Sequence, residues 1–123
     1  VNKKGAAQLT VGGGLKDLKL IYGLTVEKSD VSYDFSFFKS KKISVGRKDI
    51  SIAPDIDLGP YDEGPYVSRI QGYFFIEDGG LYYEDKGKNK AYINESPIKD
   101  KKIRLSNKDK LRFGSVCCEV VVR

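Results

Sequence analysis

Alternation of apolar and polar residues is the strongest pattern in this chain and constrains its fold the most. Residues 31–37 carry an apolar side chain at every second position: Val31, Tyr33, Phe35 and Phe37. The last segment does the same at Val116, Cys118, Val120 and Val122. Because successive side chains of a strand point to opposite faces, each segment is predicted to be a strand with one buried face. Cys118 is then a small core side chain.

Seven further segments are predicted to be short strands: Asp17–Tyr22, Lys42–Val45, Gly72–Ile76, Leu81–Glu84, Lys90–Ile93, Lys102–Leu105 and Lys110–Phe113. Clusters of turn-forming residues separate them, among them Asp78-Gly79-Gly80 and Glu95-Ser96-Pro97. No stretch shows a helical stripe of useful length. Many short strands at close spacing predict an all-β fold, either a β-sandwich or a barrel.

Length and composition indicate one folded domain behind a tail. The chain has 123 residues, and domains cluster around roughly 100 to 150 residues. Its aromatic content and its 40% apolar residues argue against disorder. The first 14 residues are polar and end in Gly12-Gly13-Gly14, which disfavours regular structure because glycine loses the most backbone entropy on ordering. We expect a flexible tail or linker over residues 1–14 and the domain over residues 15–123.

The composition also excludes several kinds of catalytic site. The chain contains no histidine, so it cannot form a Ser-His-Asp or Cys-His arrangement or a histidine-based zinc site. It has no glycine-rich nucleotide-binding motif. We therefore predict no enzymatic activity, no cofactor and no metal site.

The two cysteines and the hydropathy suggest where the protein acts. Cys117 and Cys118 are adjacent, so in an extended segment they point to opposite faces and cannot staple distant loops together. We expect reduced thiols. No apolar run approaches the roughly 20 residues of a membrane span, and no signal-peptide pattern opens the chain. These features predict a cytoplasmic protein without a membrane partner.

The net charge is basic and points to an anionic partner. The chain has 22 Lys and Arg against 17 Asp and Glu, which gives a formal charge of +5 at pH 7. Charge alone leaves three alternatives open: a phosphopeptide, a nucleic acid, or simple solubility.

The longest irregular segment, residues 59–66, has the sequence GPYDEGPY. Its two prolines and two glycines exclude a central strand and predict a surface loop. Loops at one end of a rigid sandwich often carry recognition. The residues that flank this loop, Gly46-Arg47 before it and Ser68-Arg69 after it, are therefore the first candidates for function.

Five short motifs follow one another along the chain: Gly46-Arg47, Ser68-Arg69, the segment from Asp85 to Asn89, Tyr92-Ile93-Asn94 and Leu111-Arg112-Phe113-Gly114. This series resembles the forkhead-associated (FHA) domain. That family's pattern has Gly-Arg, Ser-Arg-x-His, an Asp followed four residues later by Asn-Gly, Val-Asn-Gly, and a closing apolar-x-Phe-Gly. The resemblance extends over roughly residues 17–123 and lies in order and spacing.

The resemblance implies a sandwich of two antiparallel sheets with about eleven short strands, which recognises phosphothreonine through loops at one end. It assigns the contacts with the phosphopeptide to Arg47, Ser68, Arg69, Lys88 and Asn89. Arg47 would pair bidentately with phosphate oxygens, Ser68 would donate from its hydroxyl and its backbone amide, and Asn89 would hold the peptide main chain. The resemblance assigns the organisation of the loops to Gly46, Gln71 and Asn94.

Three positions depart from the family pattern. Gln71 stands in place of the histidine, and Lys90 and Glu95 stand in place of glycines. A glutamine amide can replace the histidine as a hydrogen-bonding brace, although its geometry differs. Glycine relieves positive φ, so Lys90 predicts a different backbone at the loop that meets the peptide.

These features define three function classes. The first is a signalling module that binds a phosphothreonine-containing protein or peptide, and we expect further domains in a longer chain because the sequence has no initiator Met. The second is a divergent FHA domain that contacts its partner without phosphate. The departures at Gln71, Lys90 and Glu95 favour this class. The third, nucleic-acid binding, has only the net charge in its favour.

Overall fold

A computed structural model describes residues 22–99 and 101–123 of the chain. The predicted tail over residues 1–14 lies outside the described residues. The predicted strand Asp17–Tyr22 also lies outside them, apart from its last residue.

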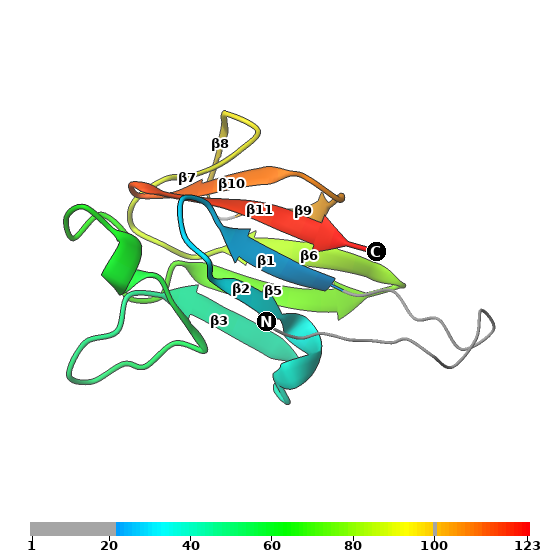
Figure 1. Cartoon of the computed structure of the whole chain (residues 1–123), viewed down its shortest axis with the longest axis horizontal. Helices are drawn as coiled ribbons and strands as arrows, with labels where there is room; N and C mark the ends of the chain where they lie inside the picture. The colour runs from blue at the N-terminus through cyan, green and yellow to red at the C-terminus, as the bar shows by residue number, and fades with distance from the viewer. Residues whose placement is uncertain (1–21, 100) are drawn as a thin grey trace.

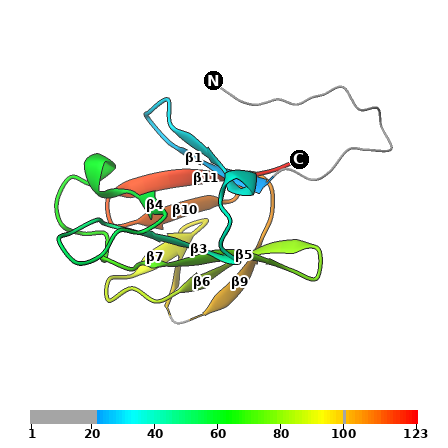
Figure 2. The same cartoon turned by 90° about the horizontal axis from the view of Figure 1, so that it is seen from below.

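Two sheets pack face to face as a β-sandwich (Figures 1 and 2). The six-stranded sheet has the order β2 (Ser32–Asp34), β1 (Tyr22–Val26), β11 (Val116–Val122), β10 (Lys110–Phe113), β7 (Ala91–Ile93) and β8 (Ser96–Ile98). The five-stranded sheet has the order β4 (Ile56–Asp57), β3 (Lys42–Gly46), β5 (Gly72–Glu77), β6 (Gly80–Asp85) and β9 (Lys102–Leu105). The described strand pairs are antiparallel, except that β3 and β4 run parallel. The predicted sandwich of about eleven short strands is confirmed.

The core lies between the sheets and is built around three aromatic rings. Phe74 of β5, Tyr83 of β6 and Phe113 of β10 are fully buried. The ring centroid of Phe74 lies 5.1 Å from that of Tyr83 and 6.5 Å from that of Phe113. Such tilted and edge-on contacts are the arrangements that aromatic rings prefer. Strands from both sheets therefore hold the same cluster.

Strand β11 confirms the predicted alternation. Val116, Cys118 and Val120 are buried, and Val122 packs against the edge of the core. Burial raises the pKa of the Cys118 thiol to about 12 because the thiolate is poorly solvated there. Cys118 is therefore core filler with little reactivity, as the sequence predicted.

The strand predicted over residues 31–37 is partly wrong. Only Ser32–Asp34 forms a strand, and Phe35–Phe37 forms a short 3-10 helix, η2. Asp34 caps this helix, because its Oδ1 accepts hydrogen bonds from the Ser36 N–H (2.9 Å) and the Ser36 hydroxyl (2.7 Å). Such local side-chain bonds compete with strand pairing. Phe35 enters the core, but Phe37 is 76% exposed, contrary to the prediction.

Three strands were missed by the sequence analysis: β1, β4 and β8. Strand β1 starts at Tyr22, where the predicted strand Asp17–Tyr22 ends. It pairs with β11 so that Tyr22 lies opposite Val122. The Tyr22 hydroxyl donates to the Gly79 carbonyl (3.1 Å) in the turn between β5 and β6. The described chain thus starts and ends at the end of the sandwich away from the β10–β11 turn. Strands β4 and β8 have two and three residues, too few for periodicity to be visible.

Candidate functional site

The end of β3 packs directly against the segment that follows the proline-bearing loop. The Arg47 N–H donates to the carbonyl oxygens of Ser68 (3.1 Å) and Arg69 (3.2 Å). A Cβ at Gly46 would collide with the Arg69 carbonyl oxygen and lie 3.0 Å from that of Ser68. Because only glycine allows this close approach, Gly46 lets the chain place Arg47 beside Ser68.

Gln71 is the centre of a buried hydrogen-bond network behind Ser68. Its side chain has no exposed surface. Its Oε1 accepts from the Ser68 N–H (3.0 Å), and its Nε2 donates to Asp85 Oδ1 (3.1 Å) and to the Asn89 carbonyl (3.0 Å). One amide thereby joins the Ser68 segment, the end of β6 and the Asn89 segment. Gln71 thus lies between the loops that it was predicted to brace, and its effect on binding stays a prediction.

Tyr83 extends the same network into the core. Its hydroxyl lies 2.8 Å from Asp85 Oδ1 and 2.9 Å from the Gln71 carbonyl oxygen, and it donates between them. Burial, and then the charge of Asp85, raise the pKa of Tyr83 far above its ordinary value. The hydroxyl therefore keeps its proton at all ordinary pH values and remains a donor.

The loop after β6 fixes the Ser68 hydroxyl. Its Oγ accepts from the N–H groups of Lys88 (3.1 Å) and Asn89 (3.3 Å). Gly87 permits this contact, because a Cβ there would collide with Gln71 Nε2 and come within 2.9 Å of Ser68 Oγ. Since the lone pairs of Ser68 Oγ face these two amides, its proton points away from them and is available to an acceptor at the surface.

The Arg47 guanidinium is held through one nitrogen. Its Nε donates to the Val67 carbonyl (3.0 Å), and the side chain is half-buried. Within the part of the chain that the structure describes, its two terminal nitrogens have no hydrogen-bond or ion-pair partner. Arg47 therefore presents a fixed fork of N–H donors, which matches the oxygens of a phosphate or carboxylate.

Arg69 is held by the connection between β3 and β4. Its Nε lies 3.2 Å from Asp49 Oδ2. Asp49 Oδ1 also accepts from the N–H groups of Ser51 (2.9 Å) and Ile52 (2.8 Å), so the carboxylate shapes the turn that it offers to Arg69. The side chain of Arg69 is 59% exposed. Arg69 thus adjoins Ser68 along the chain, while its guanidinium is directed to the β3–β4 connection.

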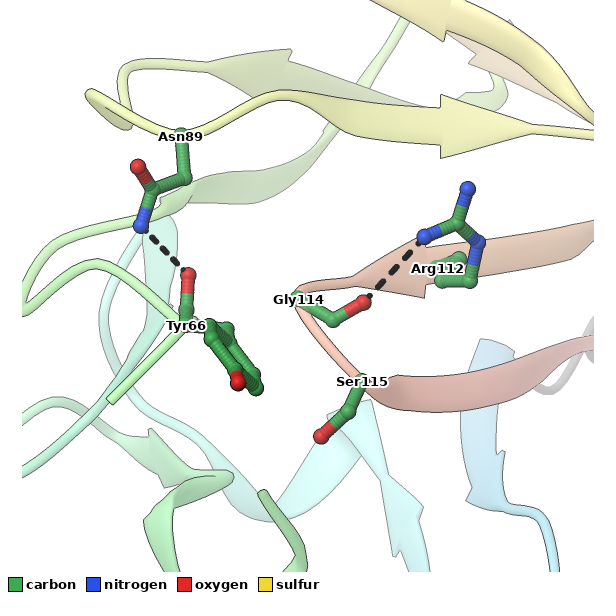
Figure 3. Close-up of a pocket in the computed structure, with 5 residues that line it drawn as sticks. All are labelled: Tyr66, Asn89, Arg112, Gly114 and Ser115. Atoms are coloured by element: carbon green, nitrogen blue, oxygen red, sulfur yellow. Dashed lines mark hydrogen bonds between the residues drawn. The ribbon is translucent and has the colours of Figure 1, made fainter. Parts of the chain in front are cut away.

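Asn89 lies at the rim of an open hollow (Figure 3). Its Nδ2 donates to the Tyr66 carbonyl (2.6 Å). The hollow has a volume of about 440 Å³ and is lined by Tyr66, Asn89, Arg112, Gly114 and Ser115. Figure 3 shows the Asn89 side-chain oxygen turned away from the Tyr66 bond. Asn89 is exposed, and its backbone N–H lies 3.3 Å from Ser68 Oγ, so its side chain adjoins the Ser68 segment at the surface.

Arg112 forms the far side of this hollow. Its guanidinium carbon lies 3.9 Å from the centroid of the Tyr92 ring. It also donates from Nη1 to the Gly114 carbonyl (3.3 Å), which Figure 3 shows as a dashed line. Stacking on the ring and this hydrogen bond keep a positive charge at the hollow.

Asp62 ties the Ser68 segment to the β10–β11 turn, and the sequence analysis missed it. Its Oδ2 accepts from the N–H groups of Tyr66 and Val67 (2.8 Å each), and its Oδ1 accepts from the Ser115 hydroxyl (2.6 Å). Partial burial works to raise the pKa of this carboxyl, but the hydrogen bonds from Ser115, Val67 and Tyr66 outweigh it and leave the pKa lowered. Asp62 is therefore ionised at neutral pH.

The structure brings together most, but not all, of the predicted site residues. Arg47, Ser68, Arg69, Lys88 and Asn89 meet at one end of the sandwich, with Gly46 and Gln71 behind them. Asn94 does not join them. Its Nδ2 donates to Asp109 Oδ1 (3.0 Å) and its Oδ1 accepts from the Lys110 N–H (2.9 Å), at the opposite ends of β7 and β10. Asn94 ties two turns together, but not those of the candidate site.

The structure bears on two expectations about the backbone of the site. The Ser68 N–H, which was expected to donate to a phosphate, donates inward to Gln71 Oε1. Lys90 was expected to give a backbone other than the positive φ that glycine relieves, and it is not among the residues with positive φ. Glu95 does have positive φ, +72°, and lies with Asn94 in the turn between β7 and β8.

A comparison with known families decides the identity of the fold. A family model described as FHA domain matches residues 43–114 of the chain. The chain belongs to the FHA-domain family. The matched region contains Gly46, Arg47, Ser68, Asn89 and the closing Phe113-Gly114, so the ordered motifs of this FHA domain lie within it.

Solved structures of FHA domains agree with this FHA domain in fold. The N-terminal FHA domain of S. cerevisiae Rad53p, solved with a phosphothreonine peptide, has a TM-score of 0.66 at 17% identity, and the match covers 84% of this chain and 94% of that one. The FHA domain of MEK1, solved with a phosphorylated HOP1 peptide, has a TM-score of 0.63 at 21% identity, and the match covers 83% of this chain and 96% of that one. The FHA domain of Chlamydia trachomatis CT664 has a TM-score of 0.63 at 19% identity, and the match covers 82% of this chain and 96% of that one. No curated protein sequence matches the chain.

The described residues of this FHA domain show neither a metal-binding cluster nor a membrane-spanning helix. Across residues 22–99 and 101–123, no group of three or more Cys, Asp or Glu side chains is placed to hold a metal ion. The same residues contain no helix with the length and apolar character needed to cross a membrane.

Proposed function

We propose that this FHA domain binds phosphothreonine-containing segments of partner proteins through Arg47, Ser68, Lys88 and Asn89. The observation that carries the proposal is the convergence of three separate segments. Arg47 N–H reaches the Ser68 carbonyl, and Ser68 Oγ lies within 3.3 Å of the Lys88 and Asn89 amides. Two FHA domains of the same fold, those of Rad53p and MEK1, were solved with phosphorylated peptides.

Each group has a distinct task in this proposal. A phosphothreonine carries a charge of about −1.5 to −2 at pH 7. The two terminal nitrogens of Arg47 pair with two of its oxygens, and the Ser68 hydroxyl donates to a third. The ammonium of Lys88, whose side chain is exposed, adds a charge nearby. The side-chain oxygen of Asn89 accepts from a main-chain N–H of the peptide.

These contacts correspond to a moderate affinity. Hydrogen bonds to charged groups contribute about 1.5 to 3 kcal/mol each. Three or four of them, less the cost of ordering a flexible peptide, correspond to a binding free energy of about 8 kcal/mol and a micromolar Kd.

The supporting residues have separate proposed roles. Gly46 and Gln71 organise the loops behind the phosphate, and Arg69 contacts the phosphate or the peptide main chain at the margin of the site. Asn94 acts on the fold, since its partners Asp109 and Lys110 lie at the far end of β10. Binding, rather than catalysis, is the proposed activity of this arrangement.

The proposed setting is signalling in the cytoplasm. A phosphothreonine reader depends on a kinase that adds the phosphate, which places it in a regulatory pathway. Cys117 and Cys118 are both free thiols, and free thiols suit a reducing compartment.

The test is calorimetric titration with a matched pair of peptides, selected from a library with phosphothreonine at a fixed position. The phosphorylated member should bind at micromolar Kd and its unphosphorylated twin at least tenfold more weakly. Arg47→Ala should lower the affinity by roughly 30- to 100-fold without changing the melting temperature. Arg47→Lys, which keeps the charge but not the fork, should fall in between. Lys41→Ala, at the other end of β3, is the matched control.

Equal affinities for the two peptides, or unchanged binding by Arg47→Ala, would overturn the proposal. In that case the binding of a partner captured from extract should persist after phosphatase treatment and in the Arg47→Ala variant. That is the behaviour of a phosphate-independent FHA domain.

A further inference from the structure

The two sides of the candidate site carry opposite charges. On one side, the β6–β7 and β8–β9 connections form what we call the basic flank: Lys86, Lys88, Lys90, Lys99 and Lys101. On the other side, the end of β4 and the β3–β4 and β4–β5 connections form the acidic flank: Asp49, Asp57, Asp62 and Glu63. Arg47 and Ser68 lie between the two flanks.

The basic flank is attached to the phosphate-binding groups. Ser68 Oγ accepts from the Lys88 N–H, as described above. The ammonium of Lys99 lies 3.5 Å from the Lys88 carbonyl oxygen, so its charge is beside the same loop. The Asp85 N–H donates to the Lys101 carbonyl (3.0 Å), which brings the β8–β9 connection against the end of β6. All five lysines of the basic flank are exposed.

Among the residues that the structure describes, most lysines of the basic flank have no ion-pair partner. Lys86 Nζ lies 3.5 Å from Glu84 Oε2. Within residues 22–99 and 101–123, no ion pair involves Lys88, Lys90, Lys99 or Lys101. A cluster of unpaired like charges has a repulsive energy that an anionic ligand relieves.

The acidic flank keeps its charge although its carboxylates are engaged. Asp49 and Asp62 accept backbone N–H bonds, and the pKa of each is lowered, so both are ionised at neutral pH. Asp57 Oδ1 accepts from the N–H groups of Lys48 (3.0 Å) and Gly59 (2.9 Å). These bonds shape the loops. Asp49 also pairs with Arg69 (3.2 Å), and Lys48 lies in the same connection, so the four carboxylates of the flank exceed these two cations by two and leave a net negative charge. A ligand with acidic residues on this side would be repelled.

We propose that the opposed charges of the two flanks select phosphothreonine segments with acidic residues on one side of the phosphate only, the side that lies over Lys88, Lys90, Lys99 and Lys101. The inference rests on the proposed function and adds the class of ligand to it. The basic flank attracts the acidic half of the segment, and the acidic flank repels a reversed charge pattern. The charge pattern therefore determines which phosphothreonines are read.

A nucleic acid is a poorer match to the basic flank. Binding of single strands combines positive charge with aromatic rings on which bases stack. The aromatic ring within residues 86–99 is that of Tyr92, and the Arg112 guanidinium covers one of its faces at 3.9 Å. The described flank thus combines several charges with a single, partly buried ring that Arg112 already covers on one face, which suits an acidic peptide better than a row of stacked bases.

The experiment uses four peptides with a central threonine in an Ala/Ser background, titrated against the whole chain. Two are neutral, with and without phosphate, and two carry phosphate with three Asp residues either before or after it. A charge-altered variant, Lys90→Gln/Lys99→Gln/Lys101→Gln, leaves the proposed phosphate contacts in place. Its matched control is Lys39→Gln/Lys41→Gln, at the other end of β3.

One of the two Asp-flanked peptides should bind about three- to tenfold more tightly than the neutral phosphopeptide, since exposed charge pairs contribute modestly. The gain should disappear in the triple variant, persist in the control, and shrink from 50 to 300 mM NaCl because salt screens exposed charges. Equal affinity for both Asp-flanked peptides, or no gain over the neutral phosphopeptide, would overturn the inference and leave the proposed function standing. Failure of the neutral pair to show phosphate dependence would instead remove the proposed function and, with it, this inference.

One further arm addresses the other class of anion. Single-stranded DNA of mixed sequence should compete with the acidic phosphopeptide only weakly. If it binds the basic flank as tightly as the best peptide, and the triple variant loses that binding, the ligand class proposed here is wrong.

Discussion

Two segments of this domain have the same sequence signature but different structures. In each, an asparagine precedes a charged residue that replaces a glycine of the family pattern: Asn89-Lys90 and Asn94-Glu95. At the first, Lys90 does not have positive φ, and the asparagine faces the hollow beside Ser68. At the second, both residues have positive φ, +47° and +72°, and the asparagine bonds to the β9–β10 turn. The signature therefore fixes neither the backbone nor the role.

The difference shows what the glycine is needed for. A residue with a side chain is destabilised by about 1 kcal/mol or more at positive φ, whereas at negative φ it has no such strain. Lys90 is thus an unstrained replacement at the binding end, and Glu95 is a strained one at the far end. Asn89 lies at the candidate site, and Asn94 joins two turns at the far end.

The largest predicted effect concerns the network that supports the binding end. Gln71→Leu removes the acceptor of the Ser68 N–H and the donor to the Asn89 carbonyl. Since buried polar groups without partners cost about 1 to 3 kcal/mol each, the free energy of unfolding should fall by about 2 to 5 kcal/mol, as measured by urea denaturation. Phosphopeptide affinity should fall as well. Gln71→His keeps one donor and one acceptor and should lose less. Unchanged stability in the Leu variant would contradict the bracing role.

The next effect tests the carboxylate that holds the Ser68 segment. Asp62→Asn removes a charged acceptor and should lower the free energy of unfolding by about 1 to 3 kcal/mol at pH 7. The pKa of Asp62 is lowered in the folded state, so its contribution is fully present above the unfolded value of about 3.9 and is lost as the pH falls through the folded pKa. The gap between the wild type and the variant should therefore narrow below about pH 4. A gap that stays constant from pH 7 to pH 2.5 contradicts this, and Asp30→Asn at an exposed position is the control.

Exchanging the two asparagines for alanine should separate binding from stability. Asn94→Ala loses the bonds to Asp109 and Lys110 and should cost about 1 to 2 kcal/mol of stability with no change in phosphopeptide Kd. Asn89→Ala should weaken phosphopeptide binding about tenfold and cost less stability, because its side chain makes one hydrogen bond, to the Tyr66 carbonyl, where that of Asn94 makes two. Thermal unfolding and titration of both variants measure the two effects. If the variants behave alike, the two asparagines do not differ in role.

The smallest effects come from restoring the two glycines. Glu95→Gly relieves a positive φ and should stabilise the domain by about 0.5 to 1 kcal/mol. Lys90→Gly relieves nothing and should destabilise it by a similar amount, since glycine adds entropy to the unfolded chain. Chemical denaturation of the pair decides the matter. Equal signs for the two changes would show that the φ difference does not control stability here.

Much of the fold could be predicted because it depends on residues that alternate over several positions. Strand β11 repeats the apolar pattern from Val116 to Val122, and its predicted faces are confirmed. The alternation continues to Phe37, but the Asp34 side chain offers the backbone of Ser36 a closer partner than a neighbouring strand. Strand β4, only Ile56–Asp57, exists because β3 lies beside it, and nothing local in its sequence marks it as a strand.

The candidate site was predictable where the order of the motifs along the chain indicated which residues lie close together in space. Arg47, Ser68 and Asn89 follow the family order, and the structure brings their segments together. Asn94 follows the same order but lies elsewhere, because β7 runs away from the site: Ala91 pairs with Phe113 near it, and Ile93 pairs with Leu111 farther along β10. Asp62 escaped notice because an aspartate in a Gly- and Pro-rich loop is an ordinary turn residue. Only the fold shows that Tyr66, Val67 and Ser115 all donate to it.

The pairing of Tyr22 with Val122 has a mechanical consequence. Strands β1 and β11 are antiparallel neighbours whose outer ends lie together. A pulling force applied at these two points would load their hydrogen bonds one after another, as in a zipper, and not all at once as in shear. The domain should therefore open at low force from this end, and the end that carries Arg47 and Ser68 should be the last part of these strands to feel the load.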